Sequence, residues 1–199
     1  MRKDAQIKAL RSDVEASDAA DWLKIPAQRS PVVLVGYSFG ARTAGGAAKL
    51  LTGETYRGKQ PSNAAVDANG PELTAADDAG VEKEDDVLPT VSLVWIAAGL
   101  SSTWTAPGGE FDPDDLHTAH LVITVNRQDP ALRWYRRLWG CGGTDAMGYV
   151  GPACIDTDDA NVEVLDVTCN VGRTHDWCVY LKAPSVRAAL RDIIAAVSP

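Results

Sequence analysis

The chain has 199 residues, of which 45% are hydrophobic and 23% are charged, and its formal net charge is −8. This length suits one domain with a sizeable core, and the composition is that of an ordered globular protein. The acidic balance argues against a nucleic-acid partner, because such partners require clustered Lys and Arg. No stretch reaches the roughly 20 apolar residues of a membrane-spanning helix, so we expect no membrane span. No targeting signal is recognised, and localisation stays open.

The N-terminal segment, residues 2–24, is rich in Ala, Asp, Lys and Glu. Its apolar residues Ile7, Leu10 and Val14 are spaced i, i+3 and i+7, which predicts an amphipathic helix. We expect the Ile-Pro pair that follows to end this helix, because proline interrupts helical hydrogen bonding.

A continuous β-branched run over residues 31–35 is typical of a strand that is buried on both faces. The small apolar residues over 39–51 predict a helix that can lie close to a sheet. Residues 53–89 are dominated by Gly, Pro, Asn, Asp and Glu without an apolar period. We interpret this range as a surface insertion, flexible over about 55–87.

The C-terminal half predicts three further strands and two helices. The strands are expected over residues 91–97, 120–126 and 161–168, and the helices over 130–139 and 185–197. The order of elements favours an α/β fold, with a mostly parallel sheet flanked by helices, in one domain over residues 1–199.

The most informative motif is Gly36-Tyr37-Ser38-Phe39-Gly40, which lies where the first predicted strand passes into a helix. A sharp turn there would force Ser38 into a strained backbone conformation. We expect side chains at positions 36 and 40 to collide with neighbouring elements, which explains the glycines. Gly-x-Ser-x-Gly in this strand–turn–helix setting is typical of a nucleophilic serine.

With its flanks, the run over residues 32–42 resembles the nucleophile elbow of the α/β-hydrolase superfamily. The resemblance implies an acid after a later strand and a histidine after the last strand, and Asp129 and His175 stand at these positions. It implies that Ser38 is the nucleophile, His175 its general base and Asp129 the acid that orients the imidazole. The backbone N–H of Phe39 would stabilise the oxyanion. No metal or cofactor is implied.

The sequence before the motif differs from that of the family. Family members have additional strands there, and one early loop supplies a second oxyanion donor. We therefore expect a reduced or N-terminally truncated sheet, completed by self-association or by an N-terminal segment, and a poor catalyst when this chain is alone.

The expected function is hydrolysis of an ester, thioester or related acyl bond in a small-molecule substrate. The competing function is a catalytically weak or inactive hydrolase-like domain used for binding or assembly. Competing structural roles are a helix N-cap for Ser38, a surface loop for His175 and a turn for Asp129. The rival acids are Asp156, Asp166 and Asp176.

The four cysteines lack the Cys-x-x-Cys spacing of zinc sites. Two disulfides and four reduced thiols are both compatible with the count. Cys169 and Cys178 bracket His175 and, if oxidised, would restrict its loop.

Three other groups of residues are candidates for a functional role. His117 and His120 stand beside aspartates and could hold a cation, but a solvated strand start is the favoured interpretation. The basic, aromatic residues over 133–139 favour a helix that covers the sheet over a substrate or nucleic-acid surface. Candidates for lining a pocket are Ser101, Ser102, Trp104 and Trp139.

Overall fold

The computed structural model describes residues 2–60, 88–155 and 161–197. Most of the expected flexible insertion lies outside these described residues. The part of the range over residues 53–60 is described, and Tyr56 within it is fully buried and stacks on Phe111. Tyr56 therefore anchors this part to the core, whereas most of its other residues are exposed, as expected for a surface segment.

A four-stranded parallel sheet forms the centre of the molecule, with the strand order β1-β2-β3-β4. Its strands are β1 (Val32–Tyr37), β2 (Val91–Ile96), β3 (His120–Val125) and β4 (Val162–Asp166). β2 is fully buried, as expected for a strand covered on both faces. The α/β class with a parallel sheet is therefore confirmed. The prediction of burial on both faces is wrong for the run over residues 31–35, because β1 lies at the edge of the sheet and only Gly36 in it is buried.

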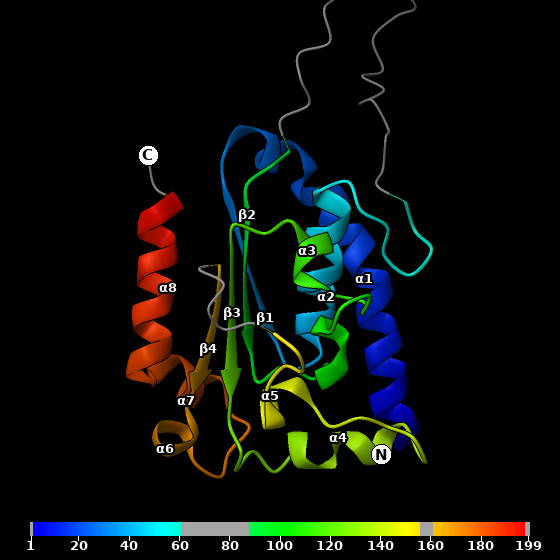
Figure 1. Ribbon diagram of the computed structural model, residues 1–199, viewed down its shortest axis with the longest axis vertical. Coiled ribbons are helices and arrows are strands. Elements are labelled where there is room, and N and C mark those ends of the chain that lie inside the picture. The colour runs from blue at the N-terminus through cyan, green and yellow to red at the C-terminus, as the bar shows by residue number, and fades with distance from the viewer. Residues whose placement is uncertain (1, 61–87, 156–160, 198–199) are drawn as a thin grey trace, which may run out of the picture.

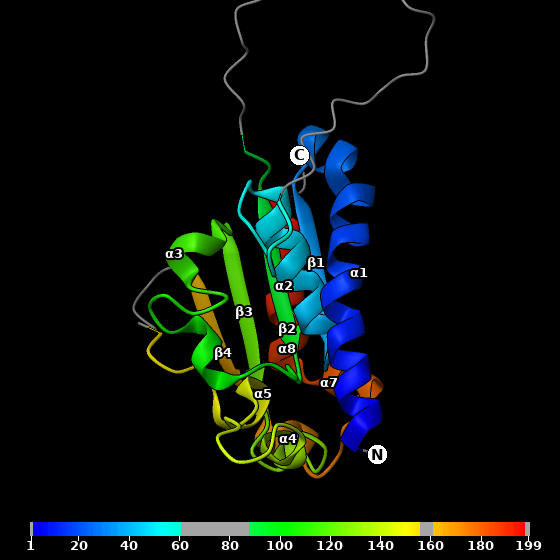
Figure 2. The same ribbon diagram turned by 90° about the vertical axis from the view of Figure 1, so that its right-hand side faces the viewer.

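Helices cover both faces of the sheet (Figure 1). On one face α2 (Gly40–Leu51) packs against β1 and β2, and α1 (Arg2–Arg29) packs on the outside of α2. On the other face lies α8 (Pro184–Val197), which contacts β1 and β3. Figure 2 shows the same layers from the side of α2, with α8 behind the sheet.

Small residues allow α2 to lie close to its neighbours. A Cβ on Gly45 would come within 2.9 Å of Phe111 and Trp95, and a Cβ on Gly46 within 2.4 Å of Tyr56. Real Cβ contacts are not this short, so only glycine fits at these two positions.

The helix α1 differs from its prediction in two ways. It continues through Pro26 to Arg29, because the proline falls in its last turn. Its buried residues are mainly alanines that face α2, whereas Ile7, Leu10 and Val14 are exposed. The apolar stripe therefore predicted the helix but not the face that packs.

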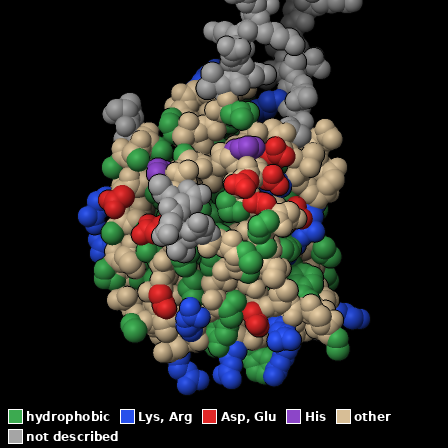
Figure 3. All heavy atoms as spheres, viewed as in Figure 1, with side chains coloured by type: hydrophobic (Ala, Val, Ile, Leu, Met, Phe, Trp, Pro, Cys, Tyr) green, Lys and Arg blue, Asp and Glu red, His purple; other side chains and the backbone are tan. Residues whose placement is uncertain are grey.

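Short helices gather at the carboxyl ends of the strands (Figure 1). They are η2 (Leu132–Trp134), α4 (Tyr135–Leu138), α5 (Met147–Val150), α6 (Thr168–Val171) and α7 (Trp177–Lys182). The prediction of one helix over 130–139 that covers the sheet is wrong, because this stretch forms two short pieces at the sheet's end. Basic side chains gather at this end of the molecule (Figure 3). Two more short helices, η1 (Ser102–Thr105) and α3 (Pro113–Leu116), lie between β2 and β3.

No helix in the described ranges is both long and apolar enough to cross a membrane.

Candidate active site

Ser38 occupies the turn between β1 and α2 with a φ of 54°. A non-glycine residue rarely adopts this left-handed conformation, so the surrounding structure must hold it in place. The Ser38 N–H donates to the Ile96 carbonyl at 3.0 Å, and the Gly99 N–H donates to the Ser38 carbonyl at 2.9 Å. Both backbone groups of Ser38 are thus bound to the chain that forms and follows β2.

The two glycines of the motif play different roles. A Cβ on Gly36 would lie 2.5 Å from Ala41 Cα, so a side chain there would separate β1 from α2. At Gly40 a Cβ would meet nothing within 4 Å. The expected collision is therefore present at position 36, and the prediction for position 40 is wrong.

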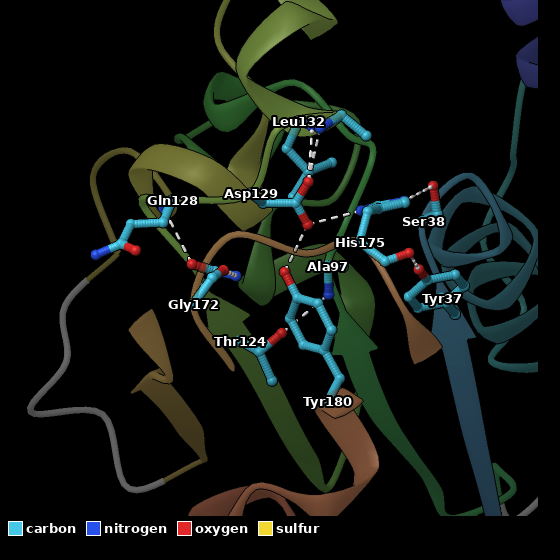
Figure 4. Close-up of polar contacts among 12 residues, drawn as sticks. Tyr37, Ser38, Ala97, Thr124, Gln128, Asp129, Leu132, Gly172, His175 and Tyr180 are labelled. Atoms are coloured by element: carbon cyan, nitrogen blue, oxygen red, sulfur yellow. Dashed lines mark hydrogen bonds and ion pairs between the residues drawn. The ribbon is translucent and has the colours of Figure 1, made fainter. Parts of the chain in front are cut away.

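His175 lies in the loop between α6 and α7, with its ring directed at Ser38. Its Nε2 atom is 3.1 Å from Ser38 Oγ. The hydroxyl of Tyr37 donates to the His175 carbonyl at 2.6 Å, and the two rings lie 5.1 Å apart. The residue before the serine therefore fixes the loop that carries the histidine (Figure 4).

Asp129 follows β3 and is fully buried. Its Oδ2 atom lies 2.6 Å from His175 Nδ1 and accepts a hydrogen bond of 2.6 Å from the Tyr180 hydroxyl. Its Oδ1 atom accepts from the backbone N–H groups of Ala131 and Leu132 at 2.9 and 3.1 Å. The carboxylate is thus saturated with donors, and His175 stands between it and Ser38 (Figure 4).

The surroundings favour the charged form of Asp129. Burial alone would raise the pKa of this carboxyl group, but hydrogen bonds from His175, Tyr180 and Leu132 outweigh burial, and the pKa lies below its ordinary value. Burial and the negative charges of Asp129 and Asp176 raise the pKa of Tyr37 to about 12. Both tyrosines near the carboxylate therefore remain neutral hydrogen-bond donors at physiological pH.

The structure brings together Ser38, Asp129 and His175, the three side chains that the sequence singles out. It does not bring the two rival acids in the described ranges to the histidine. Asp166 pairs with Arg127 and accepts from the Thr168 N–H, and Asp176 caps α7 through the Cys178 N–H. The third rival, Asp156, lies outside the described residues.

The Phe39 N–H makes no hydrogen bond to another described residue. It stands at the start of α2, directly after Ser38, where partial positive charge from the helix accumulates. The group is thus free to bind an oxygen atom that approaches Ser38.

Sequence reasoning missed Tyr37 and Tyr180, which support the histidine and the aspartate. Tyr37 lies inside the recognised motif, so the sequence predicts that it is next to Ser38, but it does not predict the hydrogen bond of Tyr37 to the His175 loop. Tyr180 lies in α7, and nothing in a helical tyrosine indicates a carboxylate partner 51 positions earlier.

The remaining candidates form no second reactive centre. All four cysteines are free and exposed, so Cys169 and Cys178 do not form a disulfide. Within the described residues no group of three or more His, Cys, Asp and Glu could hold a metal ion. His117 instead ends α3 and approaches Glu54 at 3.6 Å. Of the four residues proposed to line a pocket, Ser101, Trp104 and Trp139 do so, and Ser102 is not among its lining residues.

Comparisons with protein-family models, with curated proteins and with solved structures find no match.

Proposed function

We propose that this protein is a serine hydrolase of the α/β-hydrolase type that cleaves an ester, thioester or related acyl bond. The supporting observation is the hydrogen-bonded chain of Ser38, His175 and Asp129, whose members come from loops after β1, β4 and β3. An N-cap serine does not require a positive φ, and a surface histidine does not require a buried carboxylate at 2.6 Å. Catalysis accounts for both features together.

In the first half-reaction, Ser38 Oγ attacks the carbonyl carbon of the substrate while its proton moves to His175 Nε2. Asp129 holds Nδ1–H, which fixes the tautomer and stabilises the imidazolium that forms. The carbonyl oxygen becomes an oxyanion that the Phe39 N–H stabilises. When the tetrahedral intermediate collapses, His175 returns the proton to the leaving alcohol or thiol and the acyl group stays on Ser38.

In the second half-reaction, water replaces the leaving group. His175 takes a proton from water, whose oxygen attacks the acyl carbon, and the same proton returns to Ser38 Oγ as the acid leaves. The net reaction consumes one water molecule and releases an acid and an alcohol or thiol.

Labelling by a fluorophosphonate probe tests this assignment, because the probe reacts with activated serines and not with ordinary hydroxyl groups. We expect labelling of the native protein and none of Ser38→Ala. A matched control is Ser30→Ala, at an exposed serine just before β1, which should label like the native protein. Labelling that persists in Ser38→Ala would identify another nucleophile and overturn the proposal.

The competing function, a hydrolase-like domain without activity, predicts a different result. In that case the native protein would bind ligands but would neither label nor release p-nitrophenol from p-nitrophenyl esters. His175→Gln adds a second criterion, since loss of the base should remove labelling while the hydroxyl of Ser38 is still present.

A further inference from the structure

A pocket of ≈ 700 Å³ has a lining that does not include Ser38, Asp129 or His175. Residues from α1, α2, the chain around η1 and α4 form its walls. It is large enough for a small organic ligand, and the mechanism proposed above gives it no role.

Arg42 supplies a buried positive charge to this pocket. Its side chain is 3% exposed, and its Nε and Nη2 atoms donate to the Asp13 carboxylate at 2.9 and 2.7 Å. Its third nitrogen, Nη1, is buried and has no hydrogen-bond partner among the described residues. A guanidinium group normally uses its donors when it is buried, and beyond Asp13 the Arg42 side chain approaches the Tyr135 hydroxyl, so the wall of the pocket carries a positive charge.

A second buried donor lies in the same wall. The indole Nε1 of Trp139 is buried and has no acceptor among the described residues. Arg42 and Trp139 both approach the hydroxyl oxygen of Tyr135, where they lower its pKa against the stronger, opposing effect of burial. Arg42, Tyr135 and Trp139 all line the pocket, so this corner of the wall is polar, while the two donor atoms themselves are buried behind it.

Two more cations, Arg57 and Lys59, line the pocket together with Arg42, against a single lining carboxylate, Asp13. Arg57 also approaches Glu110 at 3.4 Å outside the lining. With Glu110 counted beside Asp13, the three cations leave a local excess of one positive charge, in a chain whose net charge is −8. It is the charge distribution expected where an anionic group binds.

The other walls are apolar or aromatic. The Trp104 ring lies against two guanidinium groups, with Arg42 Cζ at 4.6 Å and Arg57 Cζ at 4.8 Å from its centroid. Leu10 and Val14, from the exposed stripe of α1, also contribute. A ligand with an apolar body and an anionic end matches these surfaces.

The pocket is connected to the reactive serine through Phe39. Arg42 lies one helical turn after Ser38, and its N–H donates to the Phe39 carbonyl at 3.0 Å. The Phe39 ring contacts the ring of Tyr135, a lining residue, with a centroid distance of 6.4 Å. One turn of helix rises only about 5.4 Å along its axis, so the backbone of Arg42 is closer to that of Ser38 than the length of a medium-sized acyl chain.

We propose that this pocket binds a carboxylate at the far end of the acyl chain that is cleaved at Ser38, so that the preferred substrates are monoesters of dicarboxylic acids. This inference rests on the proposed hydrolase function. Arg57 and Lys59 would bind the carboxylate, Arg42 would add positive charge in the wall behind them, and the aromatic walls would cover the methylene chain.

Matched esters test the preference. Mono-p-nitrophenyl esters of succinate, adipate and suberate are compared with p-nitrophenyl alkanoates of the same chain length. We expect kcat/KM to be at least about tenfold higher for the best carboxylate ester than for its neutral partner, as one charge-assisted hydrogen bond allows. The preference should decrease as salt is added.

Substitutions of the lining residues test whether the preference for carboxylate esters arises in the pocket. Arg57→Met and Lys59→Met should each reduce the ratio of carboxylate-ester to neutral-ester kcat/KM, by about threefold to tenfold. The matched control is Arg191→Met, an exposed arginine of α8 on the opposite face of the sheet, which should leave the ratio unchanged. Arg42→Met would remove two hydrogen bonds from Asp13 and threaten folding, so Arg57 and Lys59 carry the test.

A binding measurement separates this inference from the hydrolase assignment. When suberate is titrated into Ser38→Ala protein in a calorimeter, we expect saturable binding. Adding Arg57→Met to the Ser38→Ala protein should weaken this binding. Equal hydrolysis of charged and neutral esters, without suberate binding, would overturn the inference and leave the hydrolase function standing. Suberate binding without labelling or ester hydrolysis by the native protein would overturn both the hydrolase function and the substrate assignment.

Discussion

At the scale of single residues, four hydrogen bonds converge on one buried carboxylate. Two backbone donors hold Oδ1 of Asp129, and His175 and Tyr180 hold Oδ2. A group fixed at both oxygens cannot rotate away from the histidine. The geometry of the site is therefore set by the aspartate as much as by the serine.

The lowered pKa of Asp129 predicts a specific pH dependence of stability. Because the folded state favours the carboxylate more than the unfolded state does, the associated stabilisation is complete above the ordinary value of about 3.9. It is lost as the pH falls from there through the lowered folded-state pKa. In urea unfolding, the difference in free energy of unfolding between native protein and Asp129→Asn should therefore shrink below about pH 4. A difference that is constant from pH 7 to pH 3 would contradict this account.

The same substitution should reduce ester hydrolysis at neutral pH, by about 10³- to 10⁴-fold, since an amide no longer favours the required tautomer of His175. Steady-state kinetics with a p-nitrophenyl ester measure this loss. Unfolding curves at the same pH must show that Asp129→Asn is folded. A variant with more than a tenth of native kcat/KM would remove Asp129 from the mechanism.

Tyr180→Phe removes one donor from Asp129 and leaves the others. We expect kcat to fall by about threefold to thirtyfold with little change in KM, because a hydrogen bond to a charged group contributes roughly 1.5–3 kcal/mol and only part of it reaches the reaction. The pKa of Asp129, followed by carboxyl NMR titration, should rise. Tyr149→Phe is the control, since the Tyr149 hydroxyl makes no hydrogen bond to a described residue. An unchanged Asp129 pKa in Tyr180→Phe would show that this contact is only structural.

The residues of the site divide into those that sequence could predict and those that it could not. Ser38, Asp129 and His175 each follow a predicted strand, and parallel strands deliver such residues to one edge of a sheet. Tyr37, Tyr180 and Arg42 act through contacts with distant parts of the chain, and no local pattern encodes such contacts.

At the scale of elements, the junction between β1 and α2 depends on one glycine. Gly36→Ala would place a Cβ 2.5 Å from Ala41 Cα, so strand and helix must separate. Overpacking of this kind costs about 1–3 kcal/mol. In urea unfolding, the free energy of unfolding of Gly36→Ala should therefore be lower than that of the native protein by about this amount.

Gly40→Ala is the matched control for this junction. The position is open within 4 Å, and alanine favours helix over glycine by about 1 kcal/mol. Its stability should equal or exceed that of the native protein. Equal losses in the two variants would mean that the motif's glycines serve a purpose other than packing.

Helices and strands were predictable where the spacing of their apolar residues is regular. They were less predictable where tertiary packing determines which face is buried or where an element ends. All four strands were expected within a few residues of their bounds, because runs of β-branched residues need a buried sheet. The exposed stripe of α1 shows the limit, since helical spacing alone cannot tell whether alanines or larger residues face the core. The short helices α5, α6 and α7 carry too few residues for any periodicity.

At the scale of the whole molecule, the two edges of the sheet differ. β4 ends the sheet with exposed Glu163 and Asp166, and such charges discourage pairing with another chain. β1 contains no charged residue, and its Val35 is 42% exposed. No strand in the described part of the chain pairs with the outer side of β1.

This edge predicts self-association through β1. The backbone N–H groups of Val32 and Ser38 donate to the chain around β2. Because N–H direction alternates along a strand, the N–H of Leu34 also points toward β2, and the N–H of Val35 points to the outer side of β1. Val35→Pro should keep the fold and reduce dimerisation, which sedimentation velocity measures over a range of concentrations. Leu34→Pro should instead unfold the protein by removing a bond of the sheet. A native protein that is monomeric at all concentrations would contradict the prediction.

The sequential strand order also has a consequence for how the protein is made. Each strand of the order β1-β2-β3-β4 pairs with the strand before it in the chain, so the sheet can grow as the nascent polypeptide leaves the ribosome. Ser38 emerges early, whereas His175 follows 137 positions later, after β4. Under the proposed mechanism, Ser38 has no base until His175 has been made. A nascent chain that ends before β4 is therefore inert under that mechanism, and the complete triad can form only after translation has passed the final strand of the sheet.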